Sequence, residues 1–341
     1  MLESTHCMRD SPEMEIDPLS DMLRLAKVEA VVTGGFSAGG PWAIRFPPKD
    51  KIMFMAVVKG ECWGRPEDED QWVKFETGDI GLLAVPRAFI LANAPDVPPV
   101  DAVGLFSSDG QATIGDGSDL IYLGGHVLLD PTQASLLSSV LPPWIHIHAA
   151  SPQATAFRAL LVQLVEERAG RLPGSQLASA QLTQLLFIQI LRAHLKTSTL
   201  MPAGWLKASA DPRISPALRL MHGAPSRPWN LEDLAKACGM SRTTFAAHFR
   251  SAAGVPPLTY LTDWRMRLAE QTLRESNVPL TTLARSLGYA SESAFSNAFK
   301  RVTGKSPKAC RAGERDIGSS SAQTPFDALL HRQGDIAATT S

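Results

Sequence analysis

Two stretches of the chain combine small polar side chains with cations in the same order. They read SRTTFAAHFR at 241–250 and SESAFSNAFKR at 291–301. Short side chains let a helix approach base edges in the major groove of DNA, and Arg or Lys near its end reaches phosphates. A purely structural helical hairpin with a solvated polar face is the alternative. The candidate DNA-contacting residues are Ser241, Arg242, Thr243, Thr244, Ala246, Ala247, Arg250, Ser291, Glu292, Ser293, Ser296, Asn297, Lys300 and Arg301.

The two stretches belong to a duplicated unit. From Leu231 and Leu280 onward the two sequences align with an offset of 49, which becomes 50 after one inserted residue. With the second offset, Phe245 matches Phe295, and the glycine and proline that follow also match. Matches in this order over such a length indicate an internal repeat.

Each unit, over 231–254 and 280–304, is typical of a helix-turn-helix. A short Leu-x-x-Leu-Ala helix ends at a glycine, and a serine caps the next helix. Two phenylalanines at i and i+4 then point into the core, and a second glycine ends the helix. The apolar period between the units predicts a connecting helix over 257–275. A rigid connector would hold two recognition helices in successive major grooves about 34 Å apart.

The charge distribution favours a polyanionic partner for the C-terminal part. The net charge is −1, but residues 213–311 carry 15 Lys and Arg against 6 Asp and Glu. The remainder of the chain has 18 basic and 28 acidic residues. A basic domain that carries two helix-turn-helix units is expected to bind double-stranded DNA. Chance clustering of solvated charge is the alternative for the charge signal alone.

Two histidines have the spacing of metal ligands on a strand. His146 and His148 in WIHIHAA would lie on one strand face, as in metal-binding cupins. No Asp or Glu follows them before Glu166, so we expect loop or packing histidines and no metal or other cofactor. Cys62 is expected to be a buried thiol. The sequence contains no phosphate-binding loop, dinucleotide fingerprint or GxSxG motif, so no catalytic residue is assigned and an enzyme is not predicted.

Residues 213–311 resemble the DNA-binding domain of AraC/XylS-type transcriptional regulators. The stretch LARSLGYASESAFSNAFKRVTGKSPKACR is similar to the family signature of the second helix-turn-helix. The family often has long polar readers where this chain has Ala246 and Ala247. The first unit would then read through Arg242 and Thr243, or through apolar contact with thymine methyl groups. Glu292 suits a base-reading position only if it accepts from cytosine.

The N-terminal part is predicted to be an antiparallel β structure over residues 17–150. Asp17 and Pro18 are typical of a helix start, and short apolar runs separated by GG, PP and TGD turns then favour a barrel or sandwich. The stretch from WAIRFPP to FILANAP resembles the cupin-like sensor domain of one subgroup of these regulators. The expected strands are Ala30–Gly34, Trp42–Phe46, Ile52–Lys59, Trp72–Phe75, Ile80–Val85 and Ala102–Ser107.

Helical patterns fill the segment between the two domains. Apolar residues over 151–200 predict a helical pair, which is either a dimerisation element, as in the family, or a cap on the barrel. Residues 201–212 are expected to be a linker, and the Ser/Ala/Thr-rich residues 314–341 a disordered tail. The predicted fold class is α+β with two domains: an N-terminal antiparallel cupin-like β barrel with a helical pair, and an all-α double helix-turn-helix.

The sequence therefore predicts a sequence-specific DNA-binding transcription regulator. The resemblance implies a small-molecule effector in the N-terminal barrel, contact with RNA polymerase, a homodimer and activation more often than repression. No apolar run is long enough for a membrane span and the start is polar, so a cytoplasmic protein without membrane contact is expected. Two alternatives stay open: a cupin enzyme or metal-binding protein with an appended DNA-binding domain, and an effector-independent regulator.

Overall fold

The computed structural model describes residues 16–108, 110–130, 135–170, 172–197 and 201–318. The chain divides into two compact units, of which the first comprises Met1–Arg219 with Ala235–Pro256, and the second Leu220–Leu234 with Pro257–Ser341. All strands of the described residues lie before residue 150, and helices occur in both units. This confirms the α+β fold class predicted from the sequence. None of the described helices has the length and apolar character that a membrane span needs.

Two sheets form the β structure of the first unit. The six-stranded sheet has the order β11-β6-β3-β10-β1-β9, and the five-stranded sheet has the order β5-β4-β7-β2-β8. Neighbouring strands pair antiparallel, except that β1–β9 and β2–β8 are parallel. The strands are β1 Glu29–Ala38, β2 Ala43–Phe46, β3 Ile52–Lys59, β4 Glu61–Pro66, β5 Val73–Glu76, β6 Ile80–Leu83, β7 Phe89–Ala92, β8 Val100–Asp101, β9 Gln111–Ile114, β10 Leu120–Leu128 and β11 Trp144–Ile147.

One predicted strand is wrong. The segment Ala102–Ser107 forms turns and bends after the two-residue strand β8. Val103 is 80% exposed, whereas Ala102 and Phe106 pack against the core from the turns. Gly104 has φ +88°, a left-handed conformation that interrupts a strand. The apolar run therefore belongs to an exposed turn.

Aromatic side chains from both sheets pack in the space between them. The rings of Phe36 and Tyr122, both in the six-stranded sheet, lie tilted by 31° with centroids 4.7 Å apart, and Trp42 meets Phe36 edge-on at 5.3 Å. Phe75 and Phe89 of the five-stranded sheet are buried in the same cluster. Alternate residues of a strand point to opposite faces, and each of these aromatics occupies an inward-facing position of its own segment. The barrel interior is a packed hydrophobic core.

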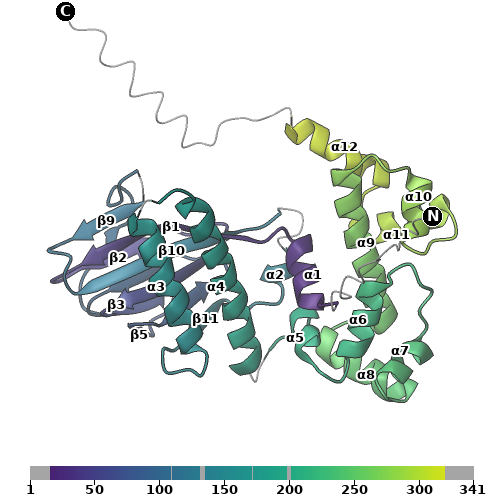
Figure 1. The fold of residues 1–341 in the computed structure, drawn as a ribbon, viewed down its shortest axis with the longest axis horizontal. Helices are drawn as coiled ribbons and strands as arrows, with labels where there is room; N and C mark the ends of the chain where they lie inside the picture. Colours follow the sequence, from purple (N-terminus) through teal and green to yellow (C-terminus); the bar gives the residue numbers. More distant parts are fainter. Residues whose placement is uncertain (1–15, 109, 131–134, 171, 198–200, 319–341) are drawn as a thin grey trace, which may run out of the picture. The chain divides into compact units, whose positions relative to one another are not determined.

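Helices flank the sheets and form the rest of the chain. As predicted, Asp17 caps α1 by accepting from the Leu19 N–H, with Pro18 in the first turn. The helical pair predicted over 151–200 is α3 and α4, which lie across one face of the six-stranded sheet (Figure 1). The helices are α1 Pro18–Leu25, α2 Ser135–Ser138, α3 Ala154–Gly170, α4 Ser175–Thr197, α5 Trp205–Ala210, α6 Ser215–Gly223, α7 Leu231–Ala237, α8 Arg242–Ala253, α9 Pro257–Glu275, α10 Leu280–Ser286, α11 Glu292–Thr303 and α12 Pro307–Gly318.

The segment predicted as a linker has structure of its own. Residues 201–212 include α5, whose Trp205 indole donates to the Leu136 carbonyl and is itself buried. At the other end, α12 extends to Gly318, past the start of the predicted tail at residue 314. The rest of that predicted tail, residues 319–341, lies outside the described residues.

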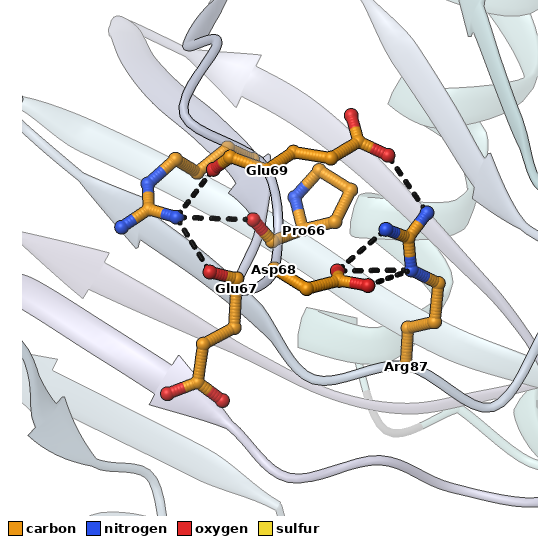
Figure 2. A network of polar contacts seen from close by, with 6 residues as sticks. Pro66, Glu67, Asp68, Glu69 and Arg87 are labelled. Carbon is orange, nitrogen blue, oxygen red and sulfur yellow. Dashed lines mark hydrogen bonds and ion pairs between the residues drawn. The ribbon is translucent and has the colours of Figure 1, made fainter.

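A polar network orders the loop between β4 and β5. The Arg65 guanidinium donates to the carbonyl oxygens of Pro66, Glu67 and Glu69. Arg87 pairs with the carboxylates of Asp68 and Glu69, and Figure 2 shows both pairs beside the loop. Acidic side chains of the loop thus pair with cations of neighbouring segments: Asp68 and Glu69 with Arg87, between β6 and β7, and Glu67 with Arg45 of β2. These contacts give no indication of a ligand site there.

Candidate functional site

Helix α8 is held in a frame of a cap, two aromatics and a closing glycine. Ser241 Oγ accepts from the Thr244 N–H at 3.2 Å, which satisfies one free donor of the first turn. Phe245 and Phe249 are fully buried, with ring centroids 5.6 Å apart. The helix ends at Gly254, whose left-handed φ of +78° lets its N–H bond the Arg250 carbonyl. One face of α8 is therefore fixed inward.

Helix α11 repeats this frame in the second unit. Ser291 Oγ accepts from the Ala294 N–H at 3.1 Å, and Gly304 ends the helix at φ +75°. Phe295 and Phe299 are fully buried in a cluster with residues of α9, α10 and α12. We call the serine cap, the buried Phe pair and the left-handed glycine the recognition-helix frame.

The fourteen candidate residues lie on the solvent side of these frames. Twelve are exposed, and Ala246 and Ser296 are half-buried. Within the described part of the chain, the cations Arg250, Lys300 and Arg301 make no salt bridge. Both helices thus carry small side chains followed by available cations, as a helix in a major groove requires.

Glu292 lies at a helix position that favours a carboxylate. It is exposed in the first turn of α11, directly after the Ser291 cap. A carboxylate at this position is favoured by the partial positive charge of a helix N-terminus. Its presence is therefore explained without a base contact.

The turn of the second helix-turn-helix needs its glycine. Gly288 has φ +81°, and a Cβ there would lie 2.3 Å from the Ser226 carbonyl oxygen. Arg265 of α9 fastens the same region by donating to the carbonyls of Pro225 and Arg227 at 2.6 and 2.8 Å. Its guanidinium also lies 5.8 Å from the ring centroid of Tyr289. Sequence reasoning missed Arg265, because it lies in the predicted connecting helix and outside the repeat.

Helix α8 has a polar anchor that α11 lacks. His248 Nε2 lies 2.7 Å from Asp211 Oδ2, and Asp211 directly follows α5. Burial acts to raise the pKa of Asp211, but hydrogen bonds from the Arg213 N–H and from His248 outweigh it and lower that pKa. The repeat places Ala298 at the position of His248. The sequence shows that His248 has no counterpart in the second unit, but no sequence pattern indicated Asp211 as the partner of His248.

A cavity lies outside the barrel, between the six-stranded sheet and the helical pair. Its volume is about 760 Å³. The wall on the sheet side includes Val31, Ile121 and Thr113, and the helices contribute Arg168 and Ser179. Glu167, Gln111 and Gln176 also line it, so the cavity combines apolar walls with hydroxyl, amide and charged groups. The resemblance implied an effector in the N-terminal barrel; Phe36 and Tyr122 of its aromatic core also line this cavity.

The two histidines of the WIHIHAA stretch have a carboxylate beside them after all. His146 lies on β11 and His148 directly after it, and Asp79 of the TGD turn is within 4.8 Å of both through its donor atoms. No carboxylate follows the two histidines closely in the sequence, but strand pairing brings Asp79 to them from earlier in the chain. Cys62, in contrast, is buried as expected, and its burial, with the charges of Asp79 and Glu61, raises its pKa to about 12. Such a thiol stays protonated and unreactive.

Comparisons with known proteins agree with this architecture. A family model described as "Cupin" matches residues 17–196, and a "Helix-turn-helix domain" model matches 234–313. An AraC-like transcription regulator from Streptomyces lividans is 38% identical over 294 residues, which cover 86% of this chain and 97% of the relative. The chain belongs to the AraC-like transcription regulators.

Two further proteins resemble this AraC-like regulator. The HTH-type transcriptional regulator AlkR from Acinetobacter baylyi is 32% identical over 282 residues, 79% of this chain and 90% of AlkR. The solved DNA-binding domain of the global transcriptional factor AdpA, in complex with a target DNA, is 31% identical. The match covers 33% of this chain and 99% of the AdpA domain, with a TM-score of 0.30. The two family models and the Streptomyces lividans relative show that the regulator is a DNA-binding protein of the AraC type with a cupin-like N-terminal domain.

Proposed function

We propose that α8 and α11 both read bases in the major groove, and that the fourteen candidate residues form the DNA interface. The observation that carries the proposal is the recognition-helix frame, which occurs twice and each time leaves the same kind of face exposed. Thr243 and Ala247 on α8, and Ser293 and Asn297 on α11, are the base-reading candidates. Arg250, Lys300 and Arg301 contact phosphates, which position the protein without reading sequence.

In-vitro selection of random duplex DNA by the full chain, at two salt concentrations, tests this proposal. The full chain is needed because α8 belongs to the same compact unit as the barrel. Two short conserved blocks, about 10 base pairs apart between centres, are expected if both helices read bases in successive grooves. One block alone would restrict base reading to a single helix. The absence of any enriched sequence would contradict the proposal.

Matched variants separate base reading from phosphate binding. Lys300→Ala should weaken binding to all selected sequences similarly and lower the magnitude of the salt slope by about 1. Arg250→Ala should do the same from the first unit. Val302→Ala, on an exposed position of α11, serves as the control and should leave affinity unchanged. If Lys300→Ala changed sequence preference without changing the salt slope, its assignment to phosphate would be wrong.

We further propose that a small amphipathic effector controls DNA binding from the cavity between the sheet and α3/α4. The packed interior of the barrel supports this location over the one expected from sequence. Ser179→Trp would fill the cavity from α4 with a bulky ring. The expected result is a regulator that still binds its site in vitro but no longer changes reporter expression with growth conditions. An unchanged response in cells would contradict the location.

The remaining roles follow from the family and from DNA binding. We propose that the protein acts in the cytoplasm, contacts RNA polymerase as an activator, pairs as a homodimer through α3 and α4, and catalyses no reaction. We also keep the predicted division into a sensor over 17–150, a helical segment over 151–200 and a DNA-binding domain over 213–311. A reporter fused to the selected site would show higher expression with the gene than without it. Lower expression would make the protein a repressor.

A further inference from the structure

Strand pairing brings three metal-binding side chains together at one end of the six-stranded sheet. β11 pairs antiparallel with β6, with Ile147 opposite Ile80 and His146 opposite Gly81. One step further along this register, His148 reaches Asp79, which directly precedes β6. Because residues two apart on an extended chain point to one face, His146 and His148 face the same carboxylate. Their ring centroids lie 4.0 Å apart.

The donor atoms have separations close to those of a metal site. His146 Nε2 lies 2.9 Å and His148 Nδ1 lies 3.8 Å from Asp79 Oδ2, and all three donors are within 4.8 Å of one another. Bonds of about 2.0–2.2 Å in a tetrahedral site imply donor–donor separations of roughly 3.3 Å. Shifts on the order of 1 Å, mainly in His148, would therefore complete the ligand set.

The carboxylate is already oriented by the backbone. Asp79 Oδ1 accepts from the Ala149 N–H at 2.6 Å, and Oδ2 accepts from the Glu76 N–H at 3.1 Å. Hydrogen bonds of this kind fix the ligands of metal sites and hold them in one rotamer. A carboxylate has lone pairs left for a metal after these bonds.

A purely structural explanation accounts for only part of the cluster. The Asp79–His146 hydrogen bond is buried, since the side chains are 4% and 11% exposed, and by itself it would be an ordinary core pair. His148 is different, because its side chain is 69% exposed and its 3.8 Å separation from Asp79 is too long for a hydrogen bond. An exposed imidazole over a buried His–Asp pair is the arrangement of a metal site that is open to solvent.

We propose that Asp79, His146 and His148 bind one divalent transition-metal ion. Two imidazoles and a carboxylate suit Zn²⁺, Co²⁺ or Fe²⁺, and leave coordination positions open on the side of His148. The ion would join the turn before β6 to the turn after β11. That second turn, in which the Ser151 N–H bonds the His148 carbonyl, leads into α3. Metal binding would thus fix the start of the helical pair, independently of DNA reading.

Titration of untagged, EDTA-stripped full-length protein with Co²⁺, followed by its visible absorption and by calorimetry, tests the proposal. One Co²⁺ per chain is expected, displaced by Zn²⁺. His148→Ala should weaken Co²⁺ binding by at least about 100-fold, because loss of a mere outer-shell partner already costs 10–100-fold. Since His148 is exposed, this variant should keep the wild-type thermal unfolding midpoint.

Two control variants make the outcome decisive. His126→Ala removes a histidine of β10 outside the cluster, and a variant with both His6→Ala and Cys7→Ala removes donors near the N-terminus. Both controls should bind Co²⁺ like the wild type. Equal Co²⁺ affinity in wild type and His148→Ala, or loss of binding only in the His6/Cys7 variant, would overturn the proposed site, as would the absence of binding by the wild type.

Discussion

The two recognition helices share one frame but have different surroundings. Each begins at a capping serine, buries two phenylalanines and ends at a left-handed glycine. Helix α8 packs against α5 and lies in the same compact unit as the sheets, whereas α11 packs among α9, α10 and α12. In both units the frame fixes one short helix with its apolar face buried and its polar face toward solvent. The elements that pack against the buried face differ between the two helices.

The exposed faces differ more than the frames. At matched positions α8 has Thr243 and Ala247, whereas α11 has Ser293 and Asn297. Asn can form a bidentate pair with adenine, while Ala offers only apolar contact with a thymine methyl group. The comparison teaches that the two units share a scaffold, whereas their proposed reading surfaces differ. Four experiments test how far this holds.

The largest effect is expected from breaking either frame at its core. Phe295→Ala and Phe245→Ala should each lower the free energy of unfolding by about 3–5 kcal/mol, because each removes a fully buried ring and leaves a cavity. Urea denaturation followed by far-UV circular dichroism measures this. The exposed-site variant Val302→Ala should change it by less than about 0.5 kcal/mol. A large loss for one phenylalanine and none for the other would mean that the frames are not equivalent.

The next effect concerns the reading surfaces. Asn297→Ala should remove about 1–3 kcal/mol of discrimination at one block of the selected site, because a bidentate base contact is lost. Thr243→Ala should alter preference only in the other block. Repeating the selection with each variant measures both changes. Changes in the same block from both variants would show that the helices do not read separate sites.

The closing glycines should respond alike. Gly254→Ala and Gly304→Ala should each cost about 1–2 kcal/mol, because an L residue is disfavoured at φ values of +78° and +75°. A Cβ at Gly304 meets nothing within 4 Å, and one at Gly254 meets Ala203 at an ordinary 3.5 Å, so backbone strain dominates both. Thermal unfolding of the two variants measures the costs. Unequal costs would indicate that the two helix ends are under different constraint.

The smallest effect distinguishes α8 from α11. His248→Ala should destabilise the protein by about 1 kcal/mol at pH 7, by loss of the hydrogen bond to Asp211. Because the folded pKa of Asp211 is lowered, its contribution is complete above the ordinary value of about 3.9 and is lost as the pH falls through the folded value. Urea midpoints of wild type and variant should therefore converge below pH 4. A constant difference across this range would argue against the pair.

Local patterns in the sequence predicted the helix-turn-helix units well. The serine caps, the Phe spacing and the connecting helix α9 at Pro257–Glu275 all follow from rules that act within one or two turns. Apolar runs predicted β1, β2, β3, β5 and β6, but β4, β7, β9, β10 and β11 were not among the expected strands. The run that contains Val103 and Gly104 forms turns instead of a strand. Non-local partners were not predictable in this way. Nothing near His146 in the chain indicates Asp79, since only the β6–β11 register brings them together.

The α5 helix has a practical consequence for anyone who recombines regulators of this type. A chimaera that joins the sensor of one protein to the reader of another would naturally be cut in the segment predicted as a linker, 201–212. In this chain a cut before Trp205 would separate it from the Leu136 carbonyl, and a cut after Asp211 would separate Asp211 from His248. Either fusion would take the two partners of one contact from different parents. Functional hybrids should be sought with α5 and its partners on both sides taken from one source.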